Sequence, residues 1–353
     1  MKPLLAQLVD GQPLTEPQAI DAFDQIMSGK ALPTQTAALL ALIAQRGATV
    51  DELVGAATVM RRKAAKVNVP KGLTAIDTCG TGGDHAGTFN ISTAAAIVAA
   101  GAGRPMNICV AKHGNKSVTS KSGSSQVLSA LGVHLTADGD TLTRCLREAG
   151  ICFCFAPQHH PAMKHAGPVR ADLGFRTLFN LVGPLTNPAG AQRQVMGVFR
   201  PQLTEPIAKV LHRLGAIHAM VVHGSIPDAD GTHADALDEL STCGASRITT
   251  LLGGNIITSE LDPTDLDLSL GHPSALRAEG PEQSAKIIRD VLAGAGSAAR
   301  EIVALNAAAA LVVAGVADDL PDGLQLAFTA LDDGSAKAAL DTLIQITNES
   351  REP

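Results

Sequence analysis

The stretch Asp77-Thr-Cys-Gly-Thr-Gly-Gly-Asp84 is the part of the sequence that decides the fold. An apolar run with the length of a strand precedes it at residues 73–76. A segment of helical character follows it at residues 92–102. A strand that leads through a glycine-rich turn into a helix is the unit from which sheets covered by helices are built.

The same alternation of short apolar runs with longer helical segments continues through the middle of the chain. Further strands are predicted at residues 106–111, 151–155, 194–199 and 218–222, and further helices at residues 124–131, 140–149 and 204–214. This pattern predicts an α/β domain with a mostly parallel sheet flanked by helices. Three helical segments near the end, at residues 281–294, 297–316 and 321–349, are expected to cover the sheet.

The first 66 residues have helical patterns only. A capping box at Thr15 and Gln18 predicts one helix start, and further helices are predicted at residues 34–46 and from Thr49. At 353 residues the chain exceeds the roughly 250 to 300 residues at which single cores stop growing. We therefore expect a small helical domain at residues 1–72 and a large α/β domain at residues 73–353.

Composition excludes several classes of protein. A hydrophobic content of 45% with 18% charged residues is that of a globular chain. The net charge of -6, the absence of Trp and Tyr and the 8 Phe residues argue against binding to nucleic acid. No apolar run reaches about 18 residues and the start lacks a secretory signal, so no membrane association and a cytoplasmic location are expected. The six scattered cysteines are expected to be reduced and buried.

The glycine segment has the chemistry of a phosphate cradle. Gly80, Gly82 and Gly83 let backbone N–H groups approach an anion, and Ser92 and Thr93 can open a helix whose positive end attracts one. A plain tight turn with a helix cap is the alternative. Neither the dinucleotide fingerprint nor the Walker-type loop fits the spacing.

A second segment, Lys112-His-Gly-Asn-Lys-Ser-Val-Thr-Ser-Lys-Ser-Gly-Ser-Ser125, combines three lysines with many hydroxyl groups after an apolar strand. It supplies a local positive potential that the acidic chain otherwise lacks. A solvated surface loop is the alternative interpretation. Both segments follow strands, and ligands of open α/β sheets bind at the carboxyl ends of strands. Together they predict a site for a phosphate-bearing small molecule.

With two further stretches, these segments resemble the anthranilate phosphoribosyltransferase family. The stretches are His159-His-Pro-Ala-Met-Lys-His-Ala-Gly-Pro-Val-Arg170 and Gly174-Phe-Arg-Thr-Leu-Phe-Asn-Leu-Val-Gly-Pro-Leu-Thr-Asn-Pro188. The resemblance extends from the first helices to Leu305-Asn306-Ala307 and so covers nearly the whole chain.

The resemblance implies transfer of the 5-phosphoribosyl group from phosphoribosyl pyrophosphate to the amine of anthranilate, a step of tryptophan biosynthesis. It implies a nucleoside phosphorylase/phosphoribosyltransferase-like fold and Mg²⁺ as cofactor, with two ions. It also implies a homodimer formed through the helical domain, which residues 167–190 would join.

The resemblance also assigns roles to residues, none of them as an acid or base. It places anthranilate at Gly80, His113, Asn115 and Arg170, and the metal at Ser92, Asp238 and Glu239. It places the phosphoribosyl donor at Gly80, Gly83, Asp84, Thr88, Asn90, Ile91, Ser92, Thr93, Lys112, His113, Gly114, Asn115, Lys116, Ser117, Val118, Thr119, Ser120 and Ser124.

Some interpretations stay open. Asp238 and Glu239 are expected on an exposed loop, where adjacent carboxylates are often only solvated charge, and Arg170 has Asp172 as an alternative, structural partner. In the second segment Ser125-Gln126 replaces the family's Ala-Asp, so an acidic position is lost, and the loop at residues 224–236 is longer than usual. The alternative functions are a pyrimidine nucleoside phosphorylase-like enzyme and a non-catalytic relative that binds nucleic acid.

Overall fold

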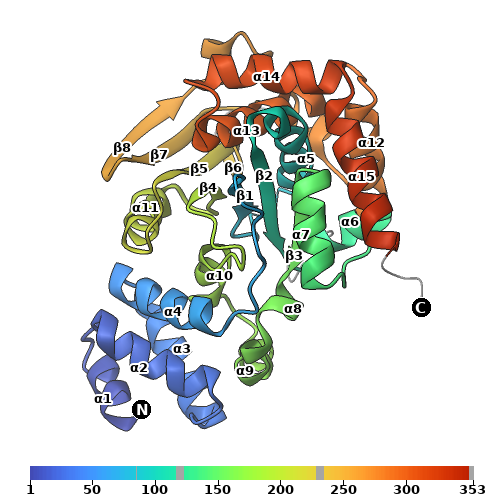
Figure 1. Cartoon of the computed structure of the whole chain (residues 1–353). Helices are drawn as coiled ribbons and strands as arrows, with labels where there is room; N and C mark the ends of the chain where they lie inside the picture. Colours follow the sequence, from blue (N-terminus) through green and yellow to red (C-terminus); the bar gives the residue numbers. More distant parts are fainter. Residues whose placement is uncertain (85, 117–122, 228–233, 350–353) are drawn as a thin grey trace.

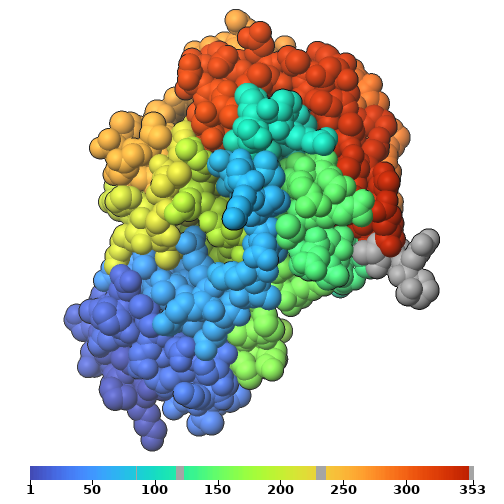
Figure 2. Space-filling model, in the orientation of Figure 1, coloured from blue at the N-terminus to red at the C-terminus, as the bar shows by residue number. Residues whose placement is uncertain are grey.

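The computed structural model of the chain describes residues 1–84, 86–116, 123–227 and 234–349. Figure 1 shows a bundle of helices at the N-terminal end and a larger part in which helices flank a sheet. The short helices α8, α9 and α10 lie where the two parts meet. Figure 2 shows that the two parts are in broad contact.

The sheet has eight strands in the described residues, in the order β3-β2-β1-β4-β5-β7-β8, with β6 paired to β5. The first five strands are parallel. The last three are antiparallel to their neighbours. The strands are β1 (Thr74–Gly80), β2 (Ile108–Gly114), β3 (Ile151–Phe155), β4 (Arg193–Gly197), β5 (His218–Pro227), β6 (Ala234–Leu237), β7 (Ser246–Leu252) and β8 (Asn255–Leu261). The predicted fold class, a mostly parallel sheet flanked by helices, is confirmed.

All five predicted strands exist, but β1 and β2 run further than expected. Asp77 to Gly80 and Lys112 to Gly114 were assigned to loops, yet they lie inside β1 and β2. The strands are longer because of tertiary contacts. Asp77 to Gly80 pair with β4 as far as the partners Gly80 and Gly197, so ladder hydrogen bonds override the local preference of polar and glycine residues for turns.

The N-terminal bundle contains α1 (Lys2–Val9), α2 (Glu16–Met27), α3 (Pro33–Arg46) and α4 (Val50–Lys63). The predicted capping box at Thr15 is present, because the Thr15 N–H donates to Gln18 Oε1 at 2.9 Å. Thr49 caps α4 in the same way with Glu52. Glu52 is fully buried and forms an ion pair with Arg46 at 2.6 Å, which fixes α3 against α4.

The helices of the larger part cover both faces of the sheet. They are α5 (Ile91–Gly103), α6 (Ser124–Leu131), α7 (Gly139–Glu148), α8 (Ala156–His159), α9 (Gly167–Leu173), α10 (Phe179–Val182), α11 (Thr204–Arg213), α12 (Pro281–Leu292), α13 (Ala298–Ala314), α14 (Leu320–Asp332) and α15 (Ser335–Glu349). The last predicted helical segment is two helices, because Gly334 at φ +80° turns the chain between α14 and α15. None of the helices in the described part is long and apolar enough to cross a membrane.

Two hydrophobic cores result. One lies between the sheet and helices α5, α13, α14 and α15. The other joins the N-terminal bundle to α9, α10, α11 and the opposite face of the sheet. Because α9 and α10 share this second core, the segment that carries Arg170 is held by both parts of the molecule. All six cysteines are buried.

Candidate active site

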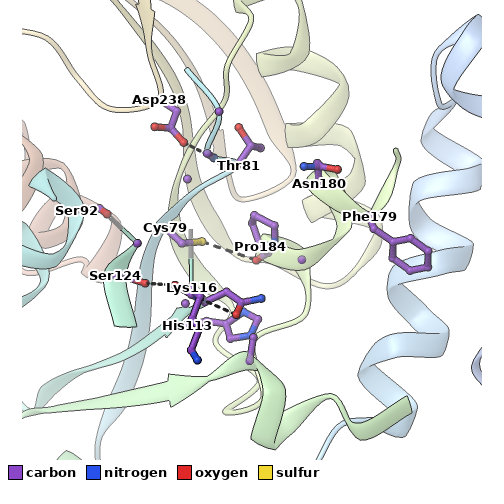
Figure 3. A pocket seen from close by; sticks show the side chains of 18 of the residues that line it. Cys79, Thr81, Ser92, His113, Lys116, Ser124, Phe179, Asn180, Pro184 and Asp238 are labelled. Carbon is purple, nitrogen blue, oxygen red and sulfur yellow. Dashed lines mark hydrogen bonds between the residues drawn. The ribbon is translucent and has the colours of Figure 1, made fainter. Parts of the chain in front are cut away.

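A cavity of about 670 Å³ lies at the carboxyl ends of the parallel strands (Figure 3). It is lined by the glycine segment, by the second segment, by residues of α8 to α10 and by the carboxylates that follow β6. The N-terminal bundle contributes Met60 from α4. The cavity is thus lined by both parts of the molecule and by segments far apart in the sequence.

Most of the predicted site residues line this cavity. They are Gly80, Gly83, Asp84, Thr88, Asn90, Ser92, Lys112, His113, Gly114, Asn115, Lys116, Ser124, Arg170, Asp238 and Glu239. Ile91 and Thr93 do not line it, because both are buried in the first turn of α5. Ser117, Val118, Thr119 and Ser120 lie outside the described residues.

The glycine segment turns away from β1 directly at the cavity. Gly82 and Gly83 have φ of +68° and +76°, a conformation that other residues adopt only with strain. The N-cap of α5 is Asn90, whose Oδ1 accepts from the Thr93 N–H at 3.2 Å. We expected Ser92 and Thr93 to open this helix, but Asn90 takes the cap. Gly82 and Gly83 of the turn and Asn90 and Ser92 at the start of α5 line the cavity, so the positive end of this helix lies at it, as anion binding requires.

Lys112 is a buried residue in the floor of the cavity. Its Nζ donates to the Thr78 carbonyl oxygen at 2.8 Å and to Ser92 Oγ at 3.2 Å. Burial lowers the pKa of Lys112, and the neighbouring Asp77 opposes that shift. The Asp77 carboxylate also accepts from the His113 N–H at 3.1 Å. The two segments are therefore tied together below the place where a ligand would lie.

The lost acidic position in the second segment has a local replacement. Gln126 Oε1 accepts from the Gly123 N–H at 3.0 Å, which is one of the two bonds of a capping box, since glycine at the N-cap has no side chain to return the other. A glutamine side chain satisfies this helix end as a carboxylate would, although it adds no charge.

Two histidines of the cavity wall, His113 and His160, lie next to one another. The Nε2 atoms of His113 and His160 are 3.2 Å apart. Burial and the neighbouring imidazole lower the pKa of His113 to about 3, and burial also lowers the pKa of His160 to about 4. Both rings are therefore neutral near pH 7. His160 was not assigned a role from the sequence, although it stands beside His159 in the family-like stretch.

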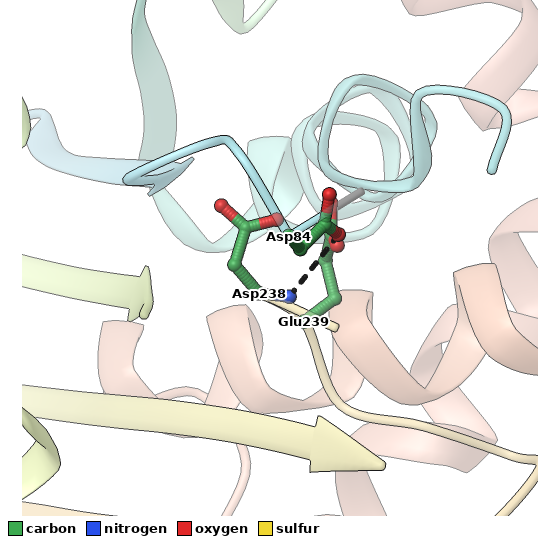
Figure 4. Close-up of side chains that lie close together, drawn as sticks. All are labelled: Asp84, Asp238 and Glu239. Carbon is green, nitrogen blue, oxygen red and sulfur yellow. Dashed lines mark hydrogen bonds between the residues drawn. The ribbon is translucent and has the colours of Figure 1, made fainter. Parts of the chain in front are cut away.

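Three carboxylates gather on the other side of the cavity (Figure 4). Asp84, Asp238 and Glu239 each have an oxygen within 4.8 Å of the other two. Asp238 Oδ2 accepts from the Gly82 N–H at 2.6 Å. Burial and the Asp238 charge raise the pKa of Asp84 to about 7, and burial with the same charge raises the pKa of Glu239 well above its usual range. Three acidic groups that repel one another at this distance have the arrangement of cation ligands.

The expectation that Asp238 and Glu239 lie on an exposed loop is wrong. Asp238 is only 8% exposed, and Glu239 is half-buried. After β6 the chain turns inward across the strand ends, where glycines leave room for it. The sequence spacing gave no sign of this burial.

Arg170 extends from α9 into the cavity and lies over the Phe179 ring, with its guanidinium carbon 5.2 Å from the ring centroid. Burial alone lowers its pKa, and it has no carboxylate partner among the residues that the structure describes. Asp172, the alternative partner, is exposed. Arg170 is thus a half-buried, partly desolvated cation that is available to an anionic group.

Arg176 is a further residue that the sequence interpretation missed. Its guanidinium donates to the Gly83 carbonyl oxygen and lies 4.5 Å from the centroid of the Phe199 ring. Its place in the family-like stretch that begins at Gly174 is the feature of the sequence that could have pointed to Arg176. No feature of the sequence indicates that Met60 lines the site, since only the packing of α4 against the α/β part brings it to the cavity.

Comparison with known proteins gives a consistent result over the whole chain. Residues 2–64 match the family described as "Glycosyl transferase family, helical bundle domain", and residues 72–337 match "Glycosyl transferase family, a/b domain". An anthranilate phosphoribosyltransferase of Rhodospirillum rubrum is 49% identical, with 98% of this chain and 95% of the relative covered. One of Azorhizobium caulinodans is 46% identical, with 98% and 96% covered.

Solved structures agree. The crystal structure of anthranilate phosphoribosyltransferase from Thermus thermophilus superimposes with a TM-score of 0.88 at 37% identity, covering 98% of this chain and 99% of that one. The Saccharomyces cerevisiae enzyme in complex with PRPP and Mg gives 0.85 at 24% identity, covering 98% and 97%. At 24% identity, the similarity to the Saccharomyces cerevisiae structure shows a shared fold only.

Proposed function

Since the chain belongs to the anthranilate phosphoribosyltransferase family, we propose that it transfers the 5-phosphoribosyl group from phosphoribosyl pyrophosphate to the amine of anthranilate. The products are N-(5-phosphoribosyl)anthranilate and pyrophosphate, and the reaction belongs to tryptophan biosynthesis. The observation that carries the proposal is the convergence of anion-binding turns, a carboxylate trio and a desolvated arginine on one cavity.

The donor would lie along the glycine segment and the second segment. Because the Gly82 N–H is taken by Asp238, the N–H groups for the donor would come from Gly83 in the turn and Ser92 at the start of α5, and Lys116 adds an exposed cation at the rim. Oxygen-rich phosphate groups are bound by such donors without a dedicated nucleotide motif. Lys112 acts from below, because its Nζ is already bonded to Thr78 and Ser92.

The carboxylate trio fits Mg²⁺. Hard oxygen ligands are what this ion prefers, and three carboxylates this close are electrostatically costly without a cation. We propose that Asp238 and Glu239 hold Mg²⁺, with Asp84 and Ser92 at the same site and two ions in all. When bound, Mg²⁺ supplies charge neutralisation for the pyrophosphate that leaves.

Anthranilate would lie toward α9 and α10. Arg170 can grip its carboxylate through two parallel hydrogen bonds, while the wall formed by His113 and His160 borders the aromatic ring. An aromatic amine is uncharged and nucleophilic at pH 7, so attack on the anomeric carbon requires no strong base. The neutral histidines agree with that chemistry.

We further propose that the protein acts in the cytoplasm as a homodimer formed through the domain of residues 1–72, joined by residues 167–190. The bundle exposes Val9 and Leu32, which are 70% and 61% accessible. An interface of this kind should bury about 1,200 Å² or more.

The test of the function is consumption of anthranilate, followed by its fluorescence, with phosphoribosyl pyrophosphate and Mg²⁺. Loss of fluorescence that depends on both additions is expected. No consumption of anthranilate, with phosphorolysis of a pyrimidine nucleoside instead, would refute the proposal in favour of a nucleoside phosphorylase. Retention of nucleic acid on a filter without turnover would point to a non-catalytic binding protein.

A further inference from the structure

The segment that carries the acidic pair lies in a slot over two neighbouring strands, β4 and β5. A Cβ atom added to Gly197, at the end of β4, would be 1.4 Å from the Asp238 carbonyl oxygen. One added to Gly224, in β5, would be 2.5 Å from the Glu239 carbonyl oxygen. Neither glycine has a positive φ, so the requirement for glycine here is one of space.

Asn306 holds the same segment from the opposite side. It lies in the middle of α13, is 5% exposed and belongs to a run from Ile302 to Ala314 in which every residue is buried. Its Oδ1 accepts from the Leu240 N–H at 2.9 Å, and its Nδ2 donates to the carbonyl oxygens of Leu240 and Ile302, each at 2.9 Å. A buried amide is tolerated only where its groups are bonded, and here Leu240 supplies both kinds of partner.

The position of Leu240 explains why this contact reaches the site. Leu240 follows Glu239 directly, and its side chain is fully buried in the core of the α/β part. Both backbone groups of one residue are therefore fixed next to the carboxylates. The segment is confined by Gly197 and Gly224 on the strand side and by Asn306 on the helix side, so the separation of its carboxylates from Asp84 is set by the scaffold.

We propose that Asn306, Gly197 and Gly224 are positioning residues that hold Asp238 and Glu239 in a geometry ready to bind a divalent cation. The inference rests on the proposed function for the identity of that cation. Cation binding requires the ionised acids, which repel one another at separations within 4.8 Å, so a segment released from the slot lets the carboxylates separate. Preorganised ligands bind more tightly than ligands that must be assembled. None of the three residues contacts the arginine end of the cavity, where anthranilate is expected.

The experiment compares two variants with two matched controls. Asn306→Leu keeps the branched shape and removes the paired hydrogen bonds, and Gly224→Ala intrudes on the segment from the other side. Thr347→Val is the control for a buried polar group, because Thr347 is 1% exposed and bonds to the His134 N–H far from the cavity. Gly139→Ala is the control for an added methyl group, since nothing lies within 4 Å of it.

Two readouts need no catalysis. Amide hydrogen exchange at Leu240 is measured without substrates, and Mn²⁺ binding is measured by electron paramagnetic resonance with phosphoribosyl pyrophosphate present. In Asn306→Leu and Gly224→Ala, we expect Leu240 to exchange about tenfold faster or more and Mn²⁺ to bind about tenfold more weakly. The Mg²⁺ concentration for half-maximal rate should rise in parallel, while the anthranilate KM stays within about twofold of the wild type. Both controls should match the wild type.

Unchanged Leu240 exchange and Mn²⁺ affinity in a folded Asn306→Leu protein would overturn the proposal, as would an equal loss in Thr347→Val. If Asn306→Leu does not fold, Gly224→Ala decides by the same measurements. Failure of the wild type to consume anthranilate would instead overturn the proposed function, and exchange at Leu240 would still report whether Asn306 fixes the segment.

Discussion

Replacement of Arg170 by alanine tests the proposed anthranilate end of the cavity. The guanidinium is half-buried, lies over the Phe179 ring and has no carboxylate partner among the described residues. A cation in this state has unused hydrogen-bonding capacity. Its planar group matches a carboxylate with two parallel bonds, which lysine cannot reproduce.

The magnitude follows from the kind of bond that is lost. A hydrogen bond to a charged group contributes about 1.5 to 3 kcal/mol. Because about 1.4 kcal/mol corresponds to a factor of ten, Arg170→Ala should raise the anthranilate KM about 10- to 150-fold. Arg170→Lys should lie between the wild type and the alanine variant. The KM for phosphoribosyl pyrophosphate should change much less, because its phosphate groups are expected on other segments.

Steady-state kinetics with each substrate varied in turn measure both constants. Arg300→Ala is the matched control, since Arg300 also lies over a ring, 5.4 Å from the centroid of Phe328, and is absent from the cavity lining. It should leave both KM values unchanged. Equal losses for the two substrates in Arg170→Ala, or no loss for anthranilate, would remove Arg170 from the anthranilate site.

Three further predictions concern the acids, the histidines and the assembly. The double variant Asp238→Asn, Glu239→Gln should abolish Mg²⁺-dependent turnover. It should not lower the melting temperature, because the substitutions remove acidic groups that repel one another and keep the side-chain volume. Near-normal activity of the double variant at low Mg²⁺ would contradict this prediction. Since burial lowers the pKa of His113 and His160, the unfolded chain takes up protons first as pH falls below about 6.5. In urea unfolding these rings should therefore remove stability between about pH 6.5 and 4, at up to about 1.4 kcal/mol per pH unit for each ring. The raised pKa values of Asp84 and Glu239 act in the opposite direction over the same range, so the measurement compares the wild type with His160→Phe, which keeps both acids and should lose less stability as the pH falls. Light scattering at micromolar concentration should give the mass of a dimer, and a monomer mass would refute the assembly.

The parallel half of the sheet could be predicted because its signals are local. Buried parallel strands are short continuous apolar runs, such as Ile151–Phe155, and this strand has the bounds that were predicted. The helices between them carry caps and stop signals in the sequence, and Ser124–Leu131 was also predicted with its observed bounds. Errors occurred at strand ends, where polar residues such as Asp77 and Lys112 continue the ladder.

The antiparallel half was missed for the opposite reason. The strand β8 alternates between exposed and half-buried residues at the edge of the sheet, and β6 has only four residues. Neither has the continuous apolar pattern that marked the other strands. Their places depend on pairing with β5 and β7, which is information about the fold and not about the segment itself.

The same distinction separates the two halves of the candidate site. The glycine turn can be predicted from the sequence, because positions with positive φ are mostly glycine wherever the rest of the chain lies. The acidic pair is different, since its burial depends on Gly197, Gly224 and Asn306, which are neighbours only in the folded chain. The parallel order β1-β4-β5 brings Gly80 and Gly197 side by side, and the return from β6 then lays Asp238 across them. A site for an anion can thus be read from one loop, whereas a site for a cation is made here by the order of the strands.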